Sequence, residues 1–136
     1  MKRVLIVEDE FTTRELMQAM LRKAHYEVVG VAADAETALV ACQEKNPDVV
    51  LLDIELQSGN GLEVLETLHA SQPEIVVIMV SGEVYAERVM QAQQLGADGF
   101  VAKPFNIERL IRAMDRARVN RAMGSTRSGQ SNLLGS

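Results

Sequence analysis

Four stretches of the sequence place polar side chains directly after a run of apolar residues. They are Glu8-Asp9 after residues 4–7, Asp53 after residues 49–52, Ser81-Gly82 after residues 75–80, and Lys103-Pro104 after residues 100–102. Short apolar runs that are rich in β-branched residues predict buried strands. The carboxyl ends of parallel strands meet at one edge of a sheet, where open α/β sheets bind their ligands. We therefore expect these polar side chains to converge at that edge.

Carboxylates at Glu8, Asp9 and Asp53 would repel one another there, and one of them would have to bind a proton. A hard divalent cation removes this cost, and Mg²⁺ suits the position because it takes oxygen ligands and keeps several waters. With the cation and the Lys103 ammonium in place, Asp53 can act as a nucleophile, since carboxylates form aspartyl-phosphate intermediates. Mg²⁺, Lys103 and the Ser81 hydroxyl would then position and neutralise the phosphoryl oxygens.

Each of these residues has a simpler interpretation when it is taken alone. A single Asp such as Asp53 at a strand end more often makes a turn or caps a helix. Ser81-Gly82 is an ordinary turn, and Lys103 is a solvated lysine. The acidic pair Glu8-Asp9 favours the dipole of the helix that follows, and Phe100 is more often a core residue. The functional interpretation rests on their common place at one sheet edge.

Helices are predicted between the strands, because apolar residues recur there at helical spacing. The expected helices cover about residues 12–24, the segment between Asp34 and Asn46, the segment from Gly61 to Pro73, residues 85–95, and the chain from residue 107 to about 120. Thr12 and Glu15 have the spacing of a capping box. Leu16, Met17 and Leu21 are expected to face the sheet, and Asp34 is expected to cap the second helix.

A further strand is expected from Tyr26 to Ala32, and five strands that alternate with five helices predict an α/β fold. We expect a single doubly wound (βα)5 domain with a flavodoxin-like parallel sheet of order 2-1-3-4-5 and right-handed crossovers. Residues 1–120 would form this domain. Residues 121–136 are rich in Gly and Ser, so we expect a flexible tail or the stub of a linker.

Composition limits the classes of function. The 136 residues carry a net charge of −5, divided into −9 over residues 1–105 and +4 over residues 106–136. The acidic body argues against direct nucleic-acid binding. Cys42 is the only cysteine, so no internal disulfide can form. No apolar run is long enough for a signal peptide or a membrane span, and we expect a soluble cytoplasmic protein.

Taken together, the motifs resemble the receiver domain of two-component response regulators, the CheY-like family. The resemblance covers residues 1 to about 120. It rests on the opening Val-Leu-Ile-Val-Glu-Asp-Glu and Gly61, together with Glu8-Asp9, Asp53, Ser81-Gly82 and Lys103-Pro104, each in its expected place.

The resemblance implies that a sensor histidine kinase or a histidine phosphotransfer protein phosphorylates Asp53. The implied Mg²⁺ ligands are Glu8, Asp9, Asp53 and the backbone carbonyl of Glu55. The implied phosphate-binding residues are Ser81, Gly82 and Lys103, and Pro104 is a candidate for a cis peptide bond after the lysine. The implied switch is a movement of the Ser81 hydroxyl toward the phosphate while Phe100 turns inward. Such a protein is a phosphoacceptor with slow self-dephosphorylation, not a metabolic enzyme.

Two positions depart from the common family pattern. Gln57 stands where the family usually has Pro, and Phe100 replaces the frequent Tyr. The family also links the positions of Glu55 and Glu83 to the lifetime of the phosphate, and we expect both to affect access of water.

The expected output surface consists of the fourth helix, the fifth strand and the fifth helix, with Arg109, Arg112, Arg116 and Arg118 on its outer side. This surface would control a partner or a missing effector domain, or form a homodimer. One alternative is a degenerate receiver that binds proteins without phosphorylation. Another is an aspartyl-phosphate phosphohydrolase of the haloacid-dehalogenase type. That type places its nucleophile after the first strand and a second Asp two residues later, whereas Asp53 follows the third strand and precedes Glu55.

Overall fold

The structure is a computed structural model that describes residues 2–123, and five strands alternate in it with five helices. The strands are β1 (Arg3–Val7), β2 (Glu27–Ala32), β3 (Val49–Asp53), β4 (Val76–Ser81) and β5 (Gly99–Ala102). The helices are α1 (Phe11–Lys23), α2 (Ala35–Lys45), α3 (Gly61–Ser71), α4 (Ala86–Gln94) and α5 (Ile107–Ala122). The predicted tail at residues 121–136 lies mostly outside the described residues.

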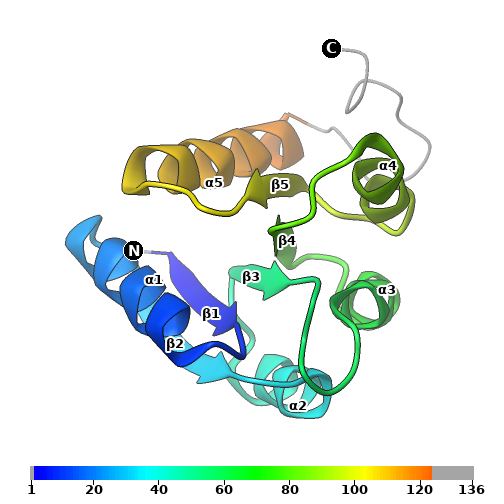
Figure 1. The fold of residues 1–136 in the computed structure, drawn as a ribbon, viewed down its shortest axis with the longest axis horizontal. Coiled ribbons are helices and arrows are strands. Elements are labelled where there is room, and N and C mark those ends of the chain that lie inside the picture. Colours follow the sequence, from blue (N-terminus) through cyan, green and yellow to red (C-terminus); the bar gives the residue numbers. More distant parts are fainter. Residues whose placement is uncertain (1, 124–136) are drawn as a thin grey trace.

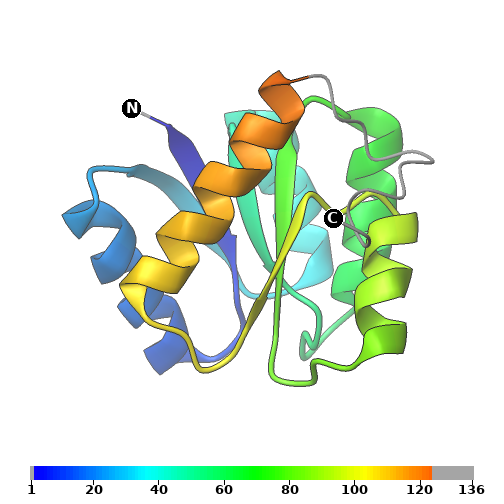
Figure 2. The same cartoon turned by 90° about the horizontal axis from the view of Figure 1, so that it is seen from above.

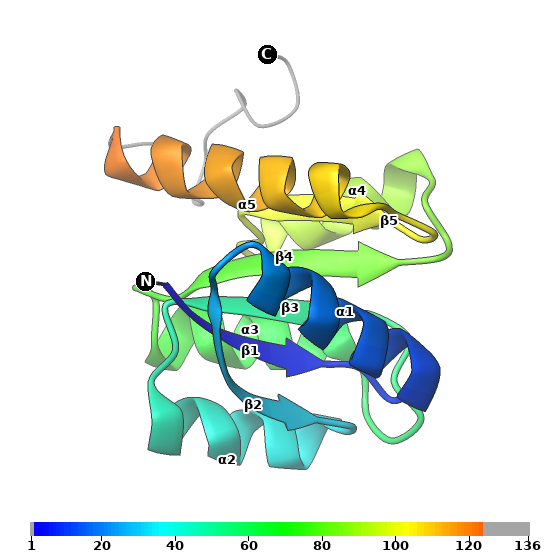
Figure 3. The same cartoon turned by 90° about the vertical axis from the view of Figure 1, so that its left-hand side faces the viewer.

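The five strands form one parallel sheet of order β2-β1-β3-β4-β5, which confirms the predicted α/β fold and its topology. α1 and α5 cover one face of this sheet, and α2, α3 and α4 cover the other (Figure 1). Seen toward the first face, α1 and α5 lie in front of the strands (Figure 3). The loops that follow β1, β3, β4 and β5 gather along one edge (Figure 2).

Two layers of core fill the space between the sheet and the helices. Leu5, Val50, Leu52 and Val77 belong to the layer under α2, α3 and α4. Alternate residues of the same strands belong to the layer under α1 and α5, which also contains Met17, Leu21, Leu110 and Met114. Because side chains alternate along a strand and both faces are covered, every residue of β3 and β4 is buried. The site at the carboxyl edge therefore rests on a rigid base.

The predicted capping box at the start of α1 is wrong. Glu10 is the N-cap residue, and its carboxylate accepts the backbone N–H groups of Thr13 at 2.7 Å and Thr12 at 3.2 Å. The side chain of Glu15 instead accepts a hydrogen bond from Gln18. The helix begins earlier than the Thr12 spacing suggests, because the longer Glu10 side chain reaches the first free N–H groups.

The prediction that Leu16 faces the sheet is also wrong, since its side chain is 53% exposed. Met17 and Leu21, one helical turn apart, form the buried stripe of α1. Leu16 is rotated about 100° from Met17 around the helix, which carries it to the rim of the interface.

The helices α2, α3 and α4 are attached to their shared face with different strength. Asp34 caps α2 as predicted, and its carboxylate accepts the Thr37 N–H at 2.8 Å. α3 buries Gly61, Leu62, Val64, Leu65 and Leu68. Of the residues described in α4, Ala92 alone is buried. Within residues 2–123, no helix is both long and apolar enough to cross a membrane.

Candidate functional site

The ends of β1 and β3 bring three carboxylates together. These neighbouring central strands end side by side, so Glu8 and Asp9 follow β1 next to Asp53 at the end of β3. The side chains of Glu8 and Asp53 are buried, at 1% and 2% exposure, and Asp9 is partly buried. One carboxylate oxygen from each of the three lies within 4.8 Å of the others. The predicted convergence of the acidic residues is therefore present.

Lys103 reaches this cluster from the loop after β5. Its Nζ atom lies 2.8 Å from Glu8 Oε1 and 3.1 Å from Asp53 Oδ2. Burial lowers the pKa of Lys103, but the hydrogen bonds and charges of Glu8 and Asp53 outweigh this and raise the pKa above its ordinary value. The lysine is therefore an ammonium ion at neutral pH. The peptide bond between Lys103 and Pro104 is cis.

The ammonium does not balance the three carboxylates. Burial, and then the negative charge of Glu8, raise the pKa of Asp53 from 3.8 to about 7, although Lys103 opposes this rise. The three carboxylates therefore carry more negative charge than the Lys103 ammonium neutralises. Hard carboxylate oxygens at this spacing fit a divalent cation such as Mg²⁺, which would supply the missing positive charge.

Ser81 lies at the end of β4, and its hydroxyl group has three hydrogen-bond contacts, the longest of them 3.4 Å to the backbone carbonyl of Glu83. The hydroxyl donates to Glu55 Oε2 at 2.7 Å and accepts the backbone N–H of Glu83 at 3.0 Å. Glu55 is in turn tied to the acidic cluster, because its own backbone N–H donates to Asp53 Oδ1 at 3.0 Å. Gly82 is exposed, and a Cβ atom there would meet nothing within 4 Å. Packing therefore does not demand a glycine at position 82.

Arg88 of α4 belongs to this part of the site, and the sequence analysis missed it. Its Nη1 atom lies 3.1 Å from Glu55 Oε2, the same oxygen that accepts the Ser81 hydroxyl. The sequence contained one signal, since Arg88 is the only Lys or Arg between Lys45 and Lys103. A single cation in such an acidic stretch has many possible partners, and the choice of Glu55 depends on how α4 docks.

Phe100 and three arginines of α5 line a groove on the outer side of β5. The groove has a volume of about 260 Å³ and includes Arg109, Arg112 and Arg116 in its lining. Phe100 is partly buried and packs against the core under α2, α3 and α4. The prediction that Arg118 shares this outer face is wrong. Its guanidinium pairs with Asp115 at 3.0 Å and donates to the hydroxyl of Tyr26 at 3.2 Å.

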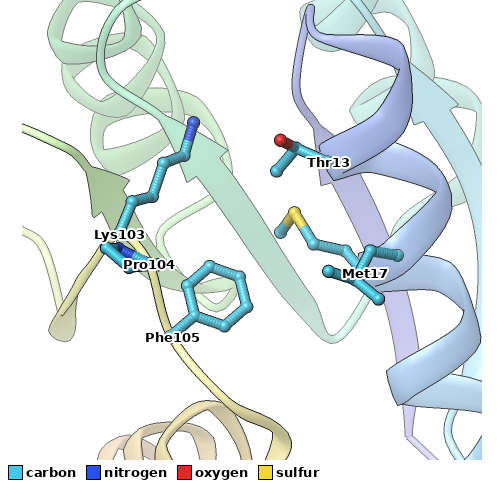
Figure 4. A pocket seen from close by; sticks show the side chains of 6 residues that line it. Thr13, Met17, Lys103, Pro104 and Phe105 are labelled. Carbon is cyan, nitrogen blue, oxygen red and sulfur yellow. The ribbon is translucent and has the colours of Figure 1, made fainter.

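A second pocket, which the sequence analysis also missed, lies beside Lys103. Its volume is about 340 Å³, and it is lined by Thr13, Leu16, Met17, Lys103, Pro104 and Phe105. Met17 of α1 and Phe105 of the loop before α5 face each other across it (Figure 4). The exposed Leu16 therefore forms part of its rim.

Several known proteins are similar to this chain in sequence or in fold. The chemotaxis protein CheY of Thermotoga maritima is 32% identical over 115 residues, which cover 85% of this chain and 96% of that protein. The nitrogen assimilation regulatory protein NtrX of Azorhizobium caulinodans is 36% identical over 84% of this chain, which corresponds to 25% of NtrX. A CheY-like response regulator receiver domain protein from Methanospirillum hungatei superposes with a TM-score of 0.82, at 29% identity, over 91% of this chain and 99% of that one.

A protein-family model described as the response regulator receiver domain matches residues 4–115. The match contains all the residues of the acidic cluster, together with Ser81 and Lys103. The chain therefore belongs to the response regulator receiver domain family, whose members serve two-component signalling.

Proposed function

We propose that this receiver domain accepts a phosphoryl group on Asp53 and thereby switches its output surface. The observation that carries the proposal is the setting of Asp53. Its carboxylate is buried, lies beside Glu8 and Asp9, and accepts a hydrogen bond from the Lys103 ammonium at 3.1 Å. A buried carboxylate next to a fixed ammonium and a cluster of hard oxygens suits phosphoryl transfer better than it suits a structural role.

In the proposed reaction an oxygen of Asp53 attacks the phosphorus of a phosphohistidine on a donor protein. The P–N bond breaks, a P–O bond to the carboxylate forms, and the leaving imidazole takes up a proton. Lys103 would hold negative charge on the phosphoryl oxygens, and the Ser81 hydroxyl would donate to one of them. Glu8, Asp9, Asp53 and the backbone carbonyl of Glu55 would hold Mg²⁺, which supplies further charge neutralisation.

The protein would act as a phosphoacceptor and not as a metabolic enzyme. The Glu55 carboxylate and the backbone of Glu83 contact the Ser81 hydroxyl, so we expect the side chains of these two residues to govern how water reaches the phosphate. The donor would be a sensor histidine kinase or a histidine phosphotransfer protein, as expected for a chain related to CheY and NtrX.

The proposed output surface consists of α4, β5 and α5. The arginine-lined groove beside Phe100 favours an acidic partner surface, on an effector or on a second copy of the chain. The predicted boundary at residue 120 falls inside α5, which continues to Ala122, so the receiver domain would extend to that residue. The rest of the chain would be a tail or a linker stub.

The intact mass after incubation with acetyl phosphate tests the proposal. We expect a gain of one phosphoryl group that requires Mg²⁺ and is absent in Asp53→Asn. A wild-type protein that gains no mass with any phosphodonor would instead favour a degenerate receiver that acts by binding alone. Turnover of the donor without a stable mass gain would favour the phosphohydrolase alternative.

A further inference from the structure

We propose that Arg88 and Glu55 are positioning residues that restrain the Ser81 hydroxyl in the unphosphorylated protein and couple it to α4. Glu55 Oε2 lies at the centre of this arrangement, because it accepts both the Ser81 hydroxyl at 2.7 Å and the Arg88 guanidinium at 3.1 Å. We call the Ser81–Glu55–Arg88 chain of contacts the α4 latch. The inference rests on the proposed role of Ser81 as a phosphate ligand.

The hydrogen bonds of Ser81 show what the latch restrains. Its hydroxyl proton is donated to Glu55, and its oxygen accepts the Glu83 N–H at 3.0 Å. A hydroxyl has one proton to donate, so Ser81 must leave Glu55 before it can donate to a phosphoryl oxygen. The latch therefore competes directly with phosphate binding.

Arg88 is held in place by contacts on several sides. Its guanidinium donates to the Tyr85 hydroxyl at 3.2 Å, lies 5.5 Å from the centre of the Tyr85 ring, and reaches Glu83 Oε1 at 3.5 Å. Although α4 is a surface helix, only 18% of the Arg88 side chain is exposed. The Glu55 side chain is 39% exposed, so without this contact its carboxylate could turn toward water, and the fixed guanidinium orients it toward Ser81.

Because α4 is weakly attached to the sheet, a change in the latch can change the position of α4. Ala92 is the residue that α4 buries, so its first turn depends on contacts such as the pair between Arg88 and Glu55. When Ser81 turns to the phosphate, Glu55 loses a donor and the pair with Arg88 is free to rearrange. Phosphorylation would in this way reach α4, which belongs to the proposed output surface, through a bistable contact. A partly exposed ion pair shifts such an equilibrium by up to about fivefold.

The first test measures phosphorylation rates with acetyl phosphate and Mg²⁺. Arg88→Ala should be phosphorylated up to about fivefold faster than wild type, because Glu55 is no longer held toward Ser81. Loss of a positive charge alone would slow the reaction of an anionic donor, so the two explanations predict opposite signs. Arg22→Ala is the matched control, since it removes an exposed arginine in the last turn of α1, away from the site.

A double-mutant cycle separates positioning from a general structural role. In the Ser81→Ala background, Arg88→Ala should no longer change the rate, because the group that the latch restrains is absent. An equal change in both backgrounds, or a slower reaction of Arg88→Ala in the wild-type background, would overturn the inference.

Amide hydrogen exchange over residues 86–94 tests the same coupling without phosphate. Ser81→Ala and Arg88→Ala should each speed exchange in α4, whereas Arg22→Ala should not. Unchanged exchange in Ser81→Ala would overturn the inference even if the protein is phosphorylated normally. If wild type is never phosphorylated, the proposed function fails, and this exchange measurement alone decides whether the latch exists.

Discussion

Asp53 and Ser81 stand at the ends of neighbouring strands, yet their surroundings differ. Asp53 shares the ends of the central strands with Glu8, and their carboxylates are buried and tied to Lys103. We call Glu8, Asp53 and Lys103 the fixed half of the edge. Ser81 faces Glu55 and Arg88, which stand on a loop and on the thinly packed α4. We call Ser81, Glu55 and Arg88 the movable half.

The neighbouring helices show the same difference. α3 begins at Gly61, where a Cβ atom would overlap the carbonyl oxygen of Asp53, so the helix packs directly onto the loop after the phosphoacceptor. α4 follows the N-cap residue Tyr85, whose hydroxyl accepts a hydrogen bond from Arg88. The fixed half is thus suited to hold charges for a reaction, and the movable half is suited to respond to it.

The largest expected effect is at Lys103. Lys103→Ala should slow phosphorylation by acetyl phosphate by about 100-fold, since it removes a fixed positive charge from the phosphoryl oxygens. Initial rates at saturating Mg²⁺ measure this, with Arg88→Ala as the comparison from the movable half. A rate loss at Lys103 of fivefold or less would erase the functional distinction between the two halves.

A pair of glycine substitutions tests the difference in packing. Gly61→Ala should lower the free energy of unfolding by about 2 to 3 kcal/mol, because the new methyl group would collide with the backbone of Asp53 and Ile54. Gly82→Ala is the matched control next to Ser81 of the movable half and should leave stability nearly unchanged, since its Cβ would enter open space. Urea unfolding measures both variants, and equal losses would contradict the comparison.

The raised pKa of Asp53 predicts a pH dependence of stability. The pKa is about 7 in the folded protein and 3.8 for the free group, so folding favours the protonated carboxyl. This contribution is complete below about pH 4 and is lost as pH rises through 7. In metal-free buffer the free energy of unfolding should therefore fall by about 2 kcal/mol between pH 5 and pH 8.

Mg²⁺ and Asp53→Asn provide the controls for this pH dependence. Mg²⁺ should stabilise wild type more at pH 8 than at pH 5, because the cation favours the ionised carboxylate. Asp53→Asn should lose most of the pH dependence. If Asp53→Asn lost as much stability as wild type between pH 5 and pH 8, a titrating group other than Asp53 would be responsible for the pH dependence.

The sequence predicts the fixed half far better than the movable half. Apolar runs end directly at Glu8, Asp53 and Lys103, and parallel pairing of buried strands leaves little choice about where those residues go. The position of Arg88 depends on how α4, a helix with little buried surface, docks against the sheet. Local periodicity does not specify this docking. The same reason explains the errors at Thr12 and Leu16, because cap choice and helix rotation are decided by tertiary contacts.

The smallest expected effect concerns the groove beside β5. Arg112 is exposed and lines this groove with Phe100, Arg109 and Arg116, on the outer side of α5. Arg112→Glu should weaken binding of an acidic partner, or self-association of the phosphorylated protein, by roughly tenfold, because it places like charges in contact.

The same substitution should leave the rate of phosphorylation unchanged, since Lys103 and not Arg112 holds charge near Asp53. Sedimentation equilibrium of the phosphorylated protein measures self-association, and Arg22→Glu on α1 is the control for charge reversal. If Arg112→Glu abolished phosphorylation, the groove would be part of the reacting site. The chemistry and the output would then not be separable along this edge, because a change on α5 would reach Asp53 without passing through Ser81 and α4.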